Sequence, residues 1–273
     1  MSNFEMPVEL YMTEHVYSVS PTTSLEDAHH TMSGLAVSSL PLVDGNQQLT
    51  GVITRTDLIR VGRRQAGSRP KADLLTLPDM AVKRRATREV VTVGPKDPLS
   101  VAAQKMMDGH LHRVFVTDQD RLVGVLSTQD LMLAIRDKRI SLPISELMSS
   151  PIFSVRTDDP VSLATERLQK AHVTCLVVMD DGWPVGLFTQ REALEAHDRP
   201  RDTHVDQVMS SALLALDHRT PLYRAAAQAA EMEVRYIIAV NGRCVLGILT
   251  GLDFARATTW PSNRCSDLKE ARK

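Results

Sequence analysis

One seven-residue pattern recurs four times along the chain and limits its possible folds more than any other feature. Each copy has a glycine, two apolar residues, a serine or threonine, two variable residues and an acid. The four copies are Gly51–Asp57, Gly124–Asp130, Gly186–Glu192 and Gly247–Asp253. Recurrence at similar spacing indicates a supersecondary unit that is too small to bury its apolar face alone. We therefore predict four copies of one unit, numbered repeats 1 to 4.

A helical stripe of mostly apolar residues precedes each copy of the pattern. Its members stand at positions i, i+3, i+4 and i+7, which share one face of an α-helix. The stripes start at Leu25, Leu99, Val161 and Leu222. In three repeats a capping side chain and a proline stand just before the stripe, at Asp97-Pro98, Asp159-Pro160 and Thr220-Pro221. We expect that side chain to cap the helix and the proline to take its first position.

Short apolar runs follow each predicted helix and are rich in branched residues, which indicates buried strands. They span residues 40–43, 114–116, 176–179 and 237–240. Turn residues then lead into the glycine segment, so the two strands should form a hairpin. A second helix follows the acid. The predicted fold class is α/β, with units in the order strand, helix, strand, strand, helix. A leading tag recurs at Tyr11-Met12-Thr13, Leu147-Met148-Ser149 and Val208-Met209-Ser210.

The order of elements, the leading tag and the glycine pattern resemble the cystathionine-β-synthase (CBS) domain family over nearly the whole chain. The resemblance implies that the domains pair as Bateman modules, whose two sheets pack face to face and leave two clefts. Repeats 1 and 2 would form one module, and repeats 3 and 4 the other. The expected segments are repeat 1 at 8–66, a basic insert or linker at 67–88, repeat 2 at 89–140, repeat 3 at 144–200, repeat 4 at 205–260 and a tail at 261–273.

The acid of each pattern lies where the second helix of its repeat should begin. A helix N-terminus favours anions through its free N–H groups and its dipole. The resemblance implies that the serine or threonine contacts a phosphate and that the aspartate holds the ribose of an adenine nucleotide. The implied pairs are Thr54 with Asp57, Ser127 with Asp130, and Thr250 with Asp253. The alternative is that these residues only cap the helix.

Repeat 3 departs from this pattern, so Thr189 and Glu192 are weaker candidates. Glutamate is one methylene longer than aspartate, and we expect this to misplace the carboxylate for ribose binding. The resemblance also implies that the adenine stacks on apolar side chains near the first strand of a repeat. The corresponding stretches are residues 16–19, 90–93, 152–155 and 213–216.

Cations that could contact the phosphate stand before the central strand in two repeats. The resemblance implies this role for His112 and Arg113 in repeat 2 and for Arg235 in repeat 4. Repeats 1 and 3 have uncharged residues there, so repeat 2 is the best-equipped site and repeat 3 the poorest. We also expect His112 to add a charge that depends on pH. The alternative for His112 and Arg113 is a solvated helix end, where a cation complements the dipole.

The stretch from residue 60 to residue 88 carries nine basic and two acidic residues, although the whole chain has a net charge of -1. Such a block can bind RNA or another polyanion. The candidate residues are Arg63, Arg64, Lys83, Arg84 and Arg85. No aromatic residue interrupts the block, so it offers no platform for base stacking. The alternative is a solvated linker.

The leading hypothesis is a regulatory protein, not an enzyme, that binds adenosine-containing nucleotides of the AMP, ADP or ATP class. It would require no cofactor and would report to an unidentified protein partner or act as a homodimer. The chain has none of the common catalytic motifs. One rival is an RNA- or ribosome-associated protein that uses residues 60–88, with the repeats as scaffold. Another is a dimerisation module with vestigial sites.

Cysteine usage and hydropathy predict where the protein resides. The three cysteines show no paired spacing, which predicts no metal site, no disulfide framework and a reducing, cytoplasmic location. No apolar run approaches 18 residues, so we expect no contact with a membrane. The net charge of -1 excludes a globally basic nucleic-acid binder.

Overall fold

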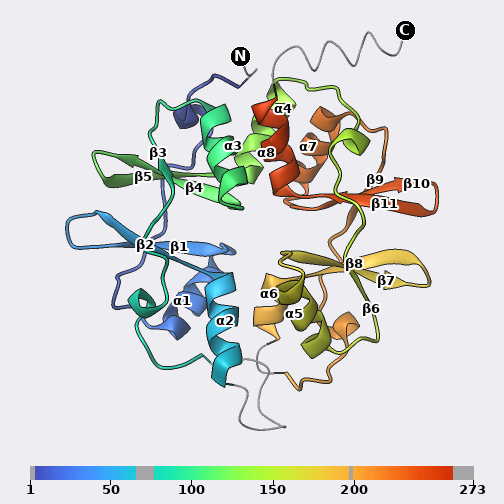
Figure 1. Cartoon of the computed structure of the whole chain (residues 1–273), viewed down its shortest axis with the longest axis horizontal. Coiled ribbons are helices and arrows are strands. Elements are labelled where there is room, and N and C mark those ends of the chain that lie inside the picture. Colours follow the sequence, from blue (N-terminus) through green and yellow to red (C-terminus); the bar gives the residue numbers. More distant parts are fainter. Residues whose placement is uncertain (1–3, 66–76, 197–198, 261–273) are drawn as a thin grey trace. The chain divides into compact units, whose positions relative to one another are not determined.

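The computed structural model describes residues 4–65, 77–196 and 199–260, without the side chains of residues 62–65. Within these residues each repeat has its own small sheet, separate from the other sheets (Figure 1). The predicted α/β class is therefore confirmed. The described residues form repeated small units and no sheet that runs continuously from one repeat into the next.

The four repeats share one order of elements, and repeat 1 lacks only the first strand. Repeat 1 has α1 (Leu25–Gly34), β1 (Ser39–Val43), β2 (Leu49–Thr54) and α2 (Arg55–Gln65). Repeat 2 has β3 (Thr92–Val93), α3 (Leu99–Asp108), β4 (Arg113–Asp118), β5 (Arg121–Ser127) and α4 (Thr128–Asp137). Repeat 3 has β6 (Ser154–Arg156), α5 (Val161–Lys170), β7 (Cys175–Asp180), β8 (Trp183–Thr189) and α6 (Gln190–Glu195). Repeat 4 has β9 (Leu214–Asp217), α7 (Leu222–Glu231), β10 (Ile237–Asn241), β11 (Cys244–Leu249) and α8 (Gly251–Thr259).

In each repeat the central strand pairs with the segments on either side of it. In repeats 2, 3 and 4 the first strand pairs with it in parallel and the glycine strand pairs with it antiparallel. In repeat 1 the first strand is reduced to one parallel bridge between Val19 and Leu42. Such a mixed pattern needs a crossover helix between the parallel strands, and the stripe helices supply it.

Four leader segments, each a 3-10 turn followed by a tag, are exchanged between consecutive repeats. They span residues 7–13, 81–87, 143–149 and 204–210, and their 3-10 turns are η1 (Val8–Leu10), η3 (Val82–Arg84), η4 (Ile144–Glu146) and η5 (Val205–Gln207). The leader before repeat 1 pairs with repeat 2, and the leader before repeat 2 pairs with repeat 1. Repeats 3 and 4 exchange their leaders in the same way. Consecutive repeats therefore complete one another's folds.

The leader at 81–87 was not predicted, because its tag reads Ala86-Thr87 and has no methionine. It lies inside the segment predicted as a basic insert or linker. Val82 is fully buried, and its N–H donates to the carbonyl of Thr23 at 2.8 Å. This part of the segment is folded chain and not a solvated linker. Residues 67–76 of the predicted insert and the predicted tail at 261–273 lie outside the described residues.

The side-chain caps that the sequence predicted for α3, α5 and α7 are absent, whereas the hydroxyl of Ser24 caps α1. Pro98, Pro160 and Pro221 occupy the N-cap position, one residue before the helix, and give no side-chain cap. The first helical N–H instead donates to a carbonyl just before a leader turn, for example Leu99 to Met6 at 2.9 Å. Leu25, Val161 and Leu222 donate in the same way to Met80, Thr203 and Leu142. A backbone acceptor thus satisfies an N–H that has no partner within its own helix.

The recurrent glycine is required because the leader passes directly over it. A Cβ at Gly247 would lie 2.7 Å from the carbonyl oxygen of Ser149 and 3.0 Å from the sulfur of Met148. At Gly124 and Gly186 a Cβ would lie 2.7 Å from the sulfur of the tag methionine. At Gly51 the leader carries alanine, and the nearest atom would be a carbonyl oxygen at 3.0 Å. The recurrent glycine and the residues of the tag therefore contact each other directly.

The chain divides into two compact units. The first unit holds the described parts of residues 1–16, 91–152 and 213–273, which contain repeats 2 and 4; the second holds 17–90 and 153–212, which contain repeats 1 and 3. Within the first unit α4 packs against α7 and α8, and α3 packs against α8. Within the second unit α2 packs against α6. Helical packing thus joins repeats that are not consecutive, and the face-to-face pairing of repeats 1 with 2 and 3 with 4 stays a prediction.

Each unit has its own apolar core. In the first unit the stripe residues of α3 and α7, including Leu99 and Leu222, are fully buried with Phe254 of α8. In the second unit Leu25 of α1 and Val161 of α5 are buried with Phe188 of β8. Aromatic residues make up only 4% of the chain, so aliphatic side chains and alanine provide most of both cores.

Candidate nucleotide site

The acid and the hydroxyl of every glycine pattern form the same structure at the N-terminus of the second helix. The backbone N–H and the hydroxyl of the serine or threonine both donate to one oxygen of the acid three residues later. The two distances are 2.9 and 2.6 Å for Thr54 and Asp57, 2.6 and 2.8 Å for Ser127 and Asp130, 2.9 and 2.5 Å for Thr189 and Glu192, and 2.7 and 3.0 Å for Thr250 and Asp253. The capping arrangement is therefore present in all four repeats. Contact of these residues with a ligand stays a prediction.

Repeat 2 brings its candidate cation next to this structure. Arg113, the first residue of β4, lies directly opposite Ser127 in the hairpin register. The carbonyl of His112 accepts the first N–H of α4, from Thr128, at 3.0 Å. Burial raises the pKa of Asp130 above its usual value, while the hydrogen bonds from Ser127 and the charge of Arg113 oppose that rise. The predicted residues of repeat 2 thus meet at one helix N-terminus.

Arg235 of repeat 4 adds a charge to the same region of the first unit. Burial, then Arg113, then Arg235 lower the pKa of His112 to about 4. The two guanidinium groups must lie near the imidazole to act on it. The structure therefore brings together three residues that the sequence had placed in two repeats, and all three are partly buried.

The lowered pKa of His112 contradicts the expectation that this residue adds a pH-dependent charge near neutral pH. A histidine with a pKa of about 4 is neutral from pH 6 to pH 8. The sequence could show only the neighbouring Arg113, because burial, the largest cause, and Arg235, which belongs to another repeat, depend on the tertiary structure. A neutral imidazole can still donate or accept a hydrogen bond.

Repeat 3 accommodates the longer glutamate without displacing its carboxylate from the helix end. Glu192 is buried and bonds to Thr189 as the aspartates bond to their partners. Glu192 therefore forms the same cap as the aspartates, and its misplacement for ribose binding stays a prediction. Cys175, opposite Thr189 in the hairpin, is buried, and burial and the charge of Glu192 raise its pKa well above the usual value. No cation stands at this place on the central strand.

Repeat 1 has neither histidine nor arginine before its central strand. Ser39 lies opposite Thr54 in the hairpin and is buried. Within the second unit the hydroxyl of Thr56 donates to Oε1 of Gln190 at 3.0 Å, which links the helix ends of repeats 1 and 3. A neutral hydrogen bond thus occupies the junction of the two helix ends in this unit.

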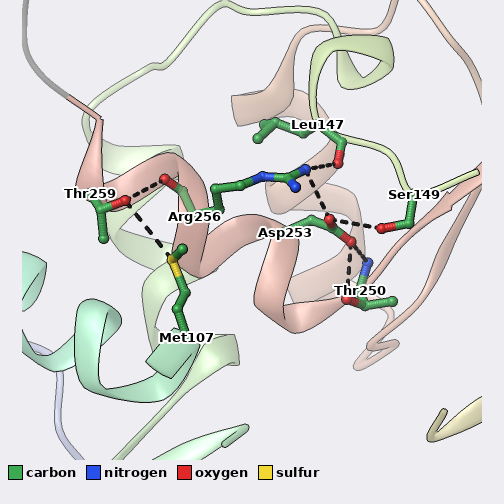
Figure 2. Close-up of polar contacts among 7 residues, drawn as sticks. All are labelled: Met107, Leu147, Ser149, Thr250, Asp253, Arg256 and Thr259. Atoms are coloured by element: carbon green, nitrogen blue, oxygen red, sulfur yellow. Dashed lines mark hydrogen bonds and ion pairs between the residues drawn. The ribbon is translucent and has the colours of Figure 1, made fainter. Parts of the chain in front are cut away.

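Repeat 4 gives its aspartate additional partners, drawn in Figure 2. Oδ1 of Asp253 accepts from the hydroxyl of Ser149 at 3.2 Å and from Nη2 of Arg256 at 3.1 Å. Burial raises the pKa of Asp253, whereas the bonds from Thr250, Arg256 and Ser149 oppose the rise. The sequence analysis missed both Arg256 and Ser149. Ser149 was visible as part of a tag, and Arg256 stands three residues after the acid, which is one helical turn.

The stretches predicted to stack the adenine lie at the first strands. Residues of β3, β6 and β9 fall in three of them, and the fourth contains the bridging Val19. Two of their aromatic side chains, Tyr17 and Phe153, are exposed. Stacking of an adenine on these stretches stays a prediction.

The basic candidates separate into two groups. Lys83, Arg84 and Arg85 are exposed at the 3-10 turn of the second leader. Arg63 and Arg64 lie in α2, but their side chains are outside the described residues.

The part of the chain that the structure describes contains no cluster of His, Cys, Asp or Glu suited to a metal ion. None of its helices is long and apolar enough to span a membrane.

The family model of the CBS domain matches residues 8–64, 82–137 and 144–199. The chain belongs to the CBS domain family. Each matched segment begins in a leader, so the CBS unit in sequence includes a segment that folds onto the neighbouring repeat. The fourth unit, with α7 and α8, has the same order of elements but lies outside the matched residues.

Several known proteins resemble this CBS chain. An uncharacterized 33.4 kDa protein in a ribosomal RNA operon of Thermofilum pendens is 23% identical over 208 residues, which are 71% of this chain and 65% of that protein. The chain thus spans less than two thirds of that relative. The crystal structure of protein MJ1225 from Methanocaldococcus jannaschii matches with a TM-score of 0.78 and 17% identity over 92% of this chain and 99% of that chain. An uncharacterized conserved protein from Pyrococcus horikoshii matches with a TM-score of 0.66 and 19% identity over 93% and 100%. These likenesses show the fold.

Proposed function

We propose that this CBS chain is a regulatory protein that binds an adenosine-containing nucleotide and reports its level to a partner. The observation that carries the proposal is the convergence at the N-terminus of α4. There Ser127 and Asp130 form the helix cap, and Arg113 lies opposite Ser127 in the hairpin. Helix N–H groups, a hydroxyl and a guanidinium are the donors that a phosphate requires. Repeat 2 is therefore the proposed principal site.

The ligand would act by binding and not by being transformed. A nucleotide that prefers one arrangement of the repeats shifts the protein toward that arrangement by its difference in affinity. We propose the fourth unit as a fourth CBS repeat, so that the chain holds two Bateman modules formed by repeats 1 and 2 and by repeats 3 and 4. The reciprocal exchange of leaders within each of these pairs supports that grouping. A homodimer or an unidentified protein partner would receive the signal.

A thermal-shift panel of AMP, ADP, ATP, S-adenosylmethionine and adenosine tests the proposal. A ligand at 100 times its Kd stabilises the folded state by about 2.7 kcal/mol, so a binder raises Tm clearly. Asp130→Asn keeps the shape of the side chain and removes its charge. It should weaken nucleotide binding by about ten-fold to a hundred-fold, since a hydrogen bond to a charged group contributes about 1.5–3 kcal/mol.

Glu192→Gln is the matched control, because it makes the equivalent change in a repeat that has no cation before its central strand. It should leave the affinity within about two-fold. Equal losses in the two variants would reject repeat 2 as the principal site. A panel with no Tm shift at millimolar ligand would reject nucleotide binding and favour a structural dimerisation module.

Phosphate recognition is tested by comparing AMP with adenosine. Arg113→Ala should remove most of the preference for AMP, and Arg113→Lys should restore only part of it, because a lysine cannot make the forked contact of a guanidinium. If the wild-type protein binds adenosine as tightly as AMP, Arg113 does not contact a phosphate and has only a structural role.

A second candidate function is polyanion binding by the leader at 81–87. The fold needs an apolar residue in each leader turn, and Val82 fills that role here. Its exposed neighbours Lys83, Arg84 and Arg85 have no counterpart in the other three turns, which carry an acid instead: Glu9, Glu146 and Asp206. The positive charge is thus not required by the fold, which favours an external anionic partner such as RNA.

A further inference from the structure

The carboxylate of Asp253 differs from the other three acids because protein donors surround it. Oδ2 accepts from the N–H and the hydroxyl of Thr250, and Oδ1 accepts from Ser149 and Arg256. The residue is only 4% exposed. In repeat 2 the arginine of the equivalent helix, Arg136, pairs with Asp137 instead.

Arg256 also forms a hydrogen bond to the leader that passes over repeat 4. One of its nitrogens, Nη2, donates both to Asp253 and to the carbonyl of Leu147 (Figure 2). Leu147 and Ser149 both belong to the leader at 143–149, which pairs with β11 through Ser149 and Ile248. The close approach of this leader to Gly247 keeps Ser149 against the aspartate. Arg256, Asp253 and the leader therefore form one connected polar network.

The same helical position explains why repeat 2 lacks this network. Arg256 is the sixth residue after the hydroxyl residue, and the equivalent residue of repeat 2 is Leu133. Leucine cannot donate to a carboxylate. In repeat 3 the equivalent residue is Glu195, which pairs with Arg191 at 2.7 Å. Repeat 1 has an arginine there, Arg60, but its side chain is exposed.

We propose that Arg256 closes the fourth nucleotide site, so that within the first unit repeat 2 holds the ligand and repeat 4 does not. This rests on the proposed function. A ribose diol must donate to carboxylate oxygens, but Arg256 and Ser149 already donate to Oδ1 of Asp253, and Thr250 donates to Oδ2. A ligand would have to displace two donors, one of them charged, from a buried acid. Arg256 is thus a specificity-determining residue that sets the number of nucleotides bound per chain.

Calorimetric titration with AMP tests the closure. Arg256→Ala should gain one additional binding event per chain relative to wild type, since Oδ1 of Asp253 then loses its charged donor and keeps only the bond from Ser149. Arg224→Ala is the matched control. Arg224 also lies on a helix of the first unit, and its guanidinium contacts Tyr223. This variant should keep the wild-type stoichiometry. Circular dichroism confirms that both variants are folded.

Two results would overturn the proposal. One is a folded Arg256→Ala protein that binds no more AMP than wild type. The other is a wild-type protein with two AMP sites, one of which is lost in Asp253→Asn, because Asp253 would then hold ligand despite Arg256.

Failure of nucleotide binding is a separate outcome. If neither wild type nor Arg256→Ala binds AMP, the proposed function fails, and the network is tested by a double-mutant cycle in thermal unfolding. Arg256→Ala and Asp253→Asn should lower Tm less together than the sum of their separate effects. Additive losses would show that Arg256 does not hold Asp253, and the proposal would be overturned.

Discussion

Replacing His112 by glutamine should remove a large part of the pH dependence of folding stability below neutral pH. In the folded protein, burial and the charges of Arg113 and Arg235 lower the pKa of His112 to about 4. In the unfolded chain the pKa of histidine is about 6.5. The unfolded chain therefore binds more protons between these two values, and the free energy of unfolding falls as the pH falls through that window.

The size of the effect follows from the two pKa values. At about pH 5 the unfolded imidazole is almost fully protonated, whereas the folded one is mostly neutral. One pKa unit corresponds to about 1.4 kcal/mol, so the wild type should lose about 2 kcal/mol between about pH 7.5 and pH 5 through this residue. For a protein of this size that corresponds to about 4–8 °C in Tm. Glutamine is similar to histidine in size and in its capacity for hydrogen bonds, but it does not titrate in this pH range.

The assay is a series of thermal unfolding curves at several pH values for the wild type, His112→Gln and a control, His30→Gln. His30 is exposed on α1, where its Nε2 lies 3.2 Å from Oε1 of Glu26 in the same helix. His112→Gln should flatten the fall in Tm with decreasing pH, and the control should follow the wild type. Parallel curves for the wild type and His112→Gln would refute the reasoning, since His112 would then titrate alike in both states.

Two further predictions concern the leaders. Gly247→Ala should destabilise the protein by about 1–3 kcal/mol, because a Cβ would lie 2.7 Å from a leader carbonyl, and the loss is measured by denaturant unfolding. Gly34→Ala, where no atom lies within 4 Å, is the control, and an equal loss there would contradict the contact. Neutralising Lys83–Arg85 together should reduce the slope of log affinity against log salt for RNA, by about 0.7–0.9 per cation that contacts phosphate. An unchanged slope, or no RNA binding at low salt, would leave these side chains as a solvated surface.

The sequence alone determined the local structure of each repeat. Helical stripes, branched runs and turn residues act over a few neighbouring positions, so four copies of the same pattern gave four copies of the same elements. The capping pair of Ser127 and Asp130 belongs to this local level, because its two residues are three apart in the chain. The family resemblance followed from the same short-range signals.

Tertiary structure decided everything that depends on which repeats meet. The sequence suggested capping of the stripe helices by their own side chains, but the leader of a neighbouring repeat supplies the acceptor. It showed the recurrent glycine but not the leader that leaves no room for a Cβ over it. No spacing rule could find this leader contact, because its partners are far apart in the chain.

The candidate site divides in the same way. The sequence identified His112 and Arg235 separately, but only the packing of repeats 2 and 4 places them together and lowers the pKa of the histidine. It also identified Asp253 as equivalent to Asp130, yet the two carboxylates have different surroundings, because Arg256 and Ser149 donate to Asp253 and the charge of Arg113 acts on Asp130. Local sequence sets which groups each repeat offers. The long-range packing sets their charge and their partners, because burial and the electrostatic interaction between charges depend on distance in space and not on distance along the chain.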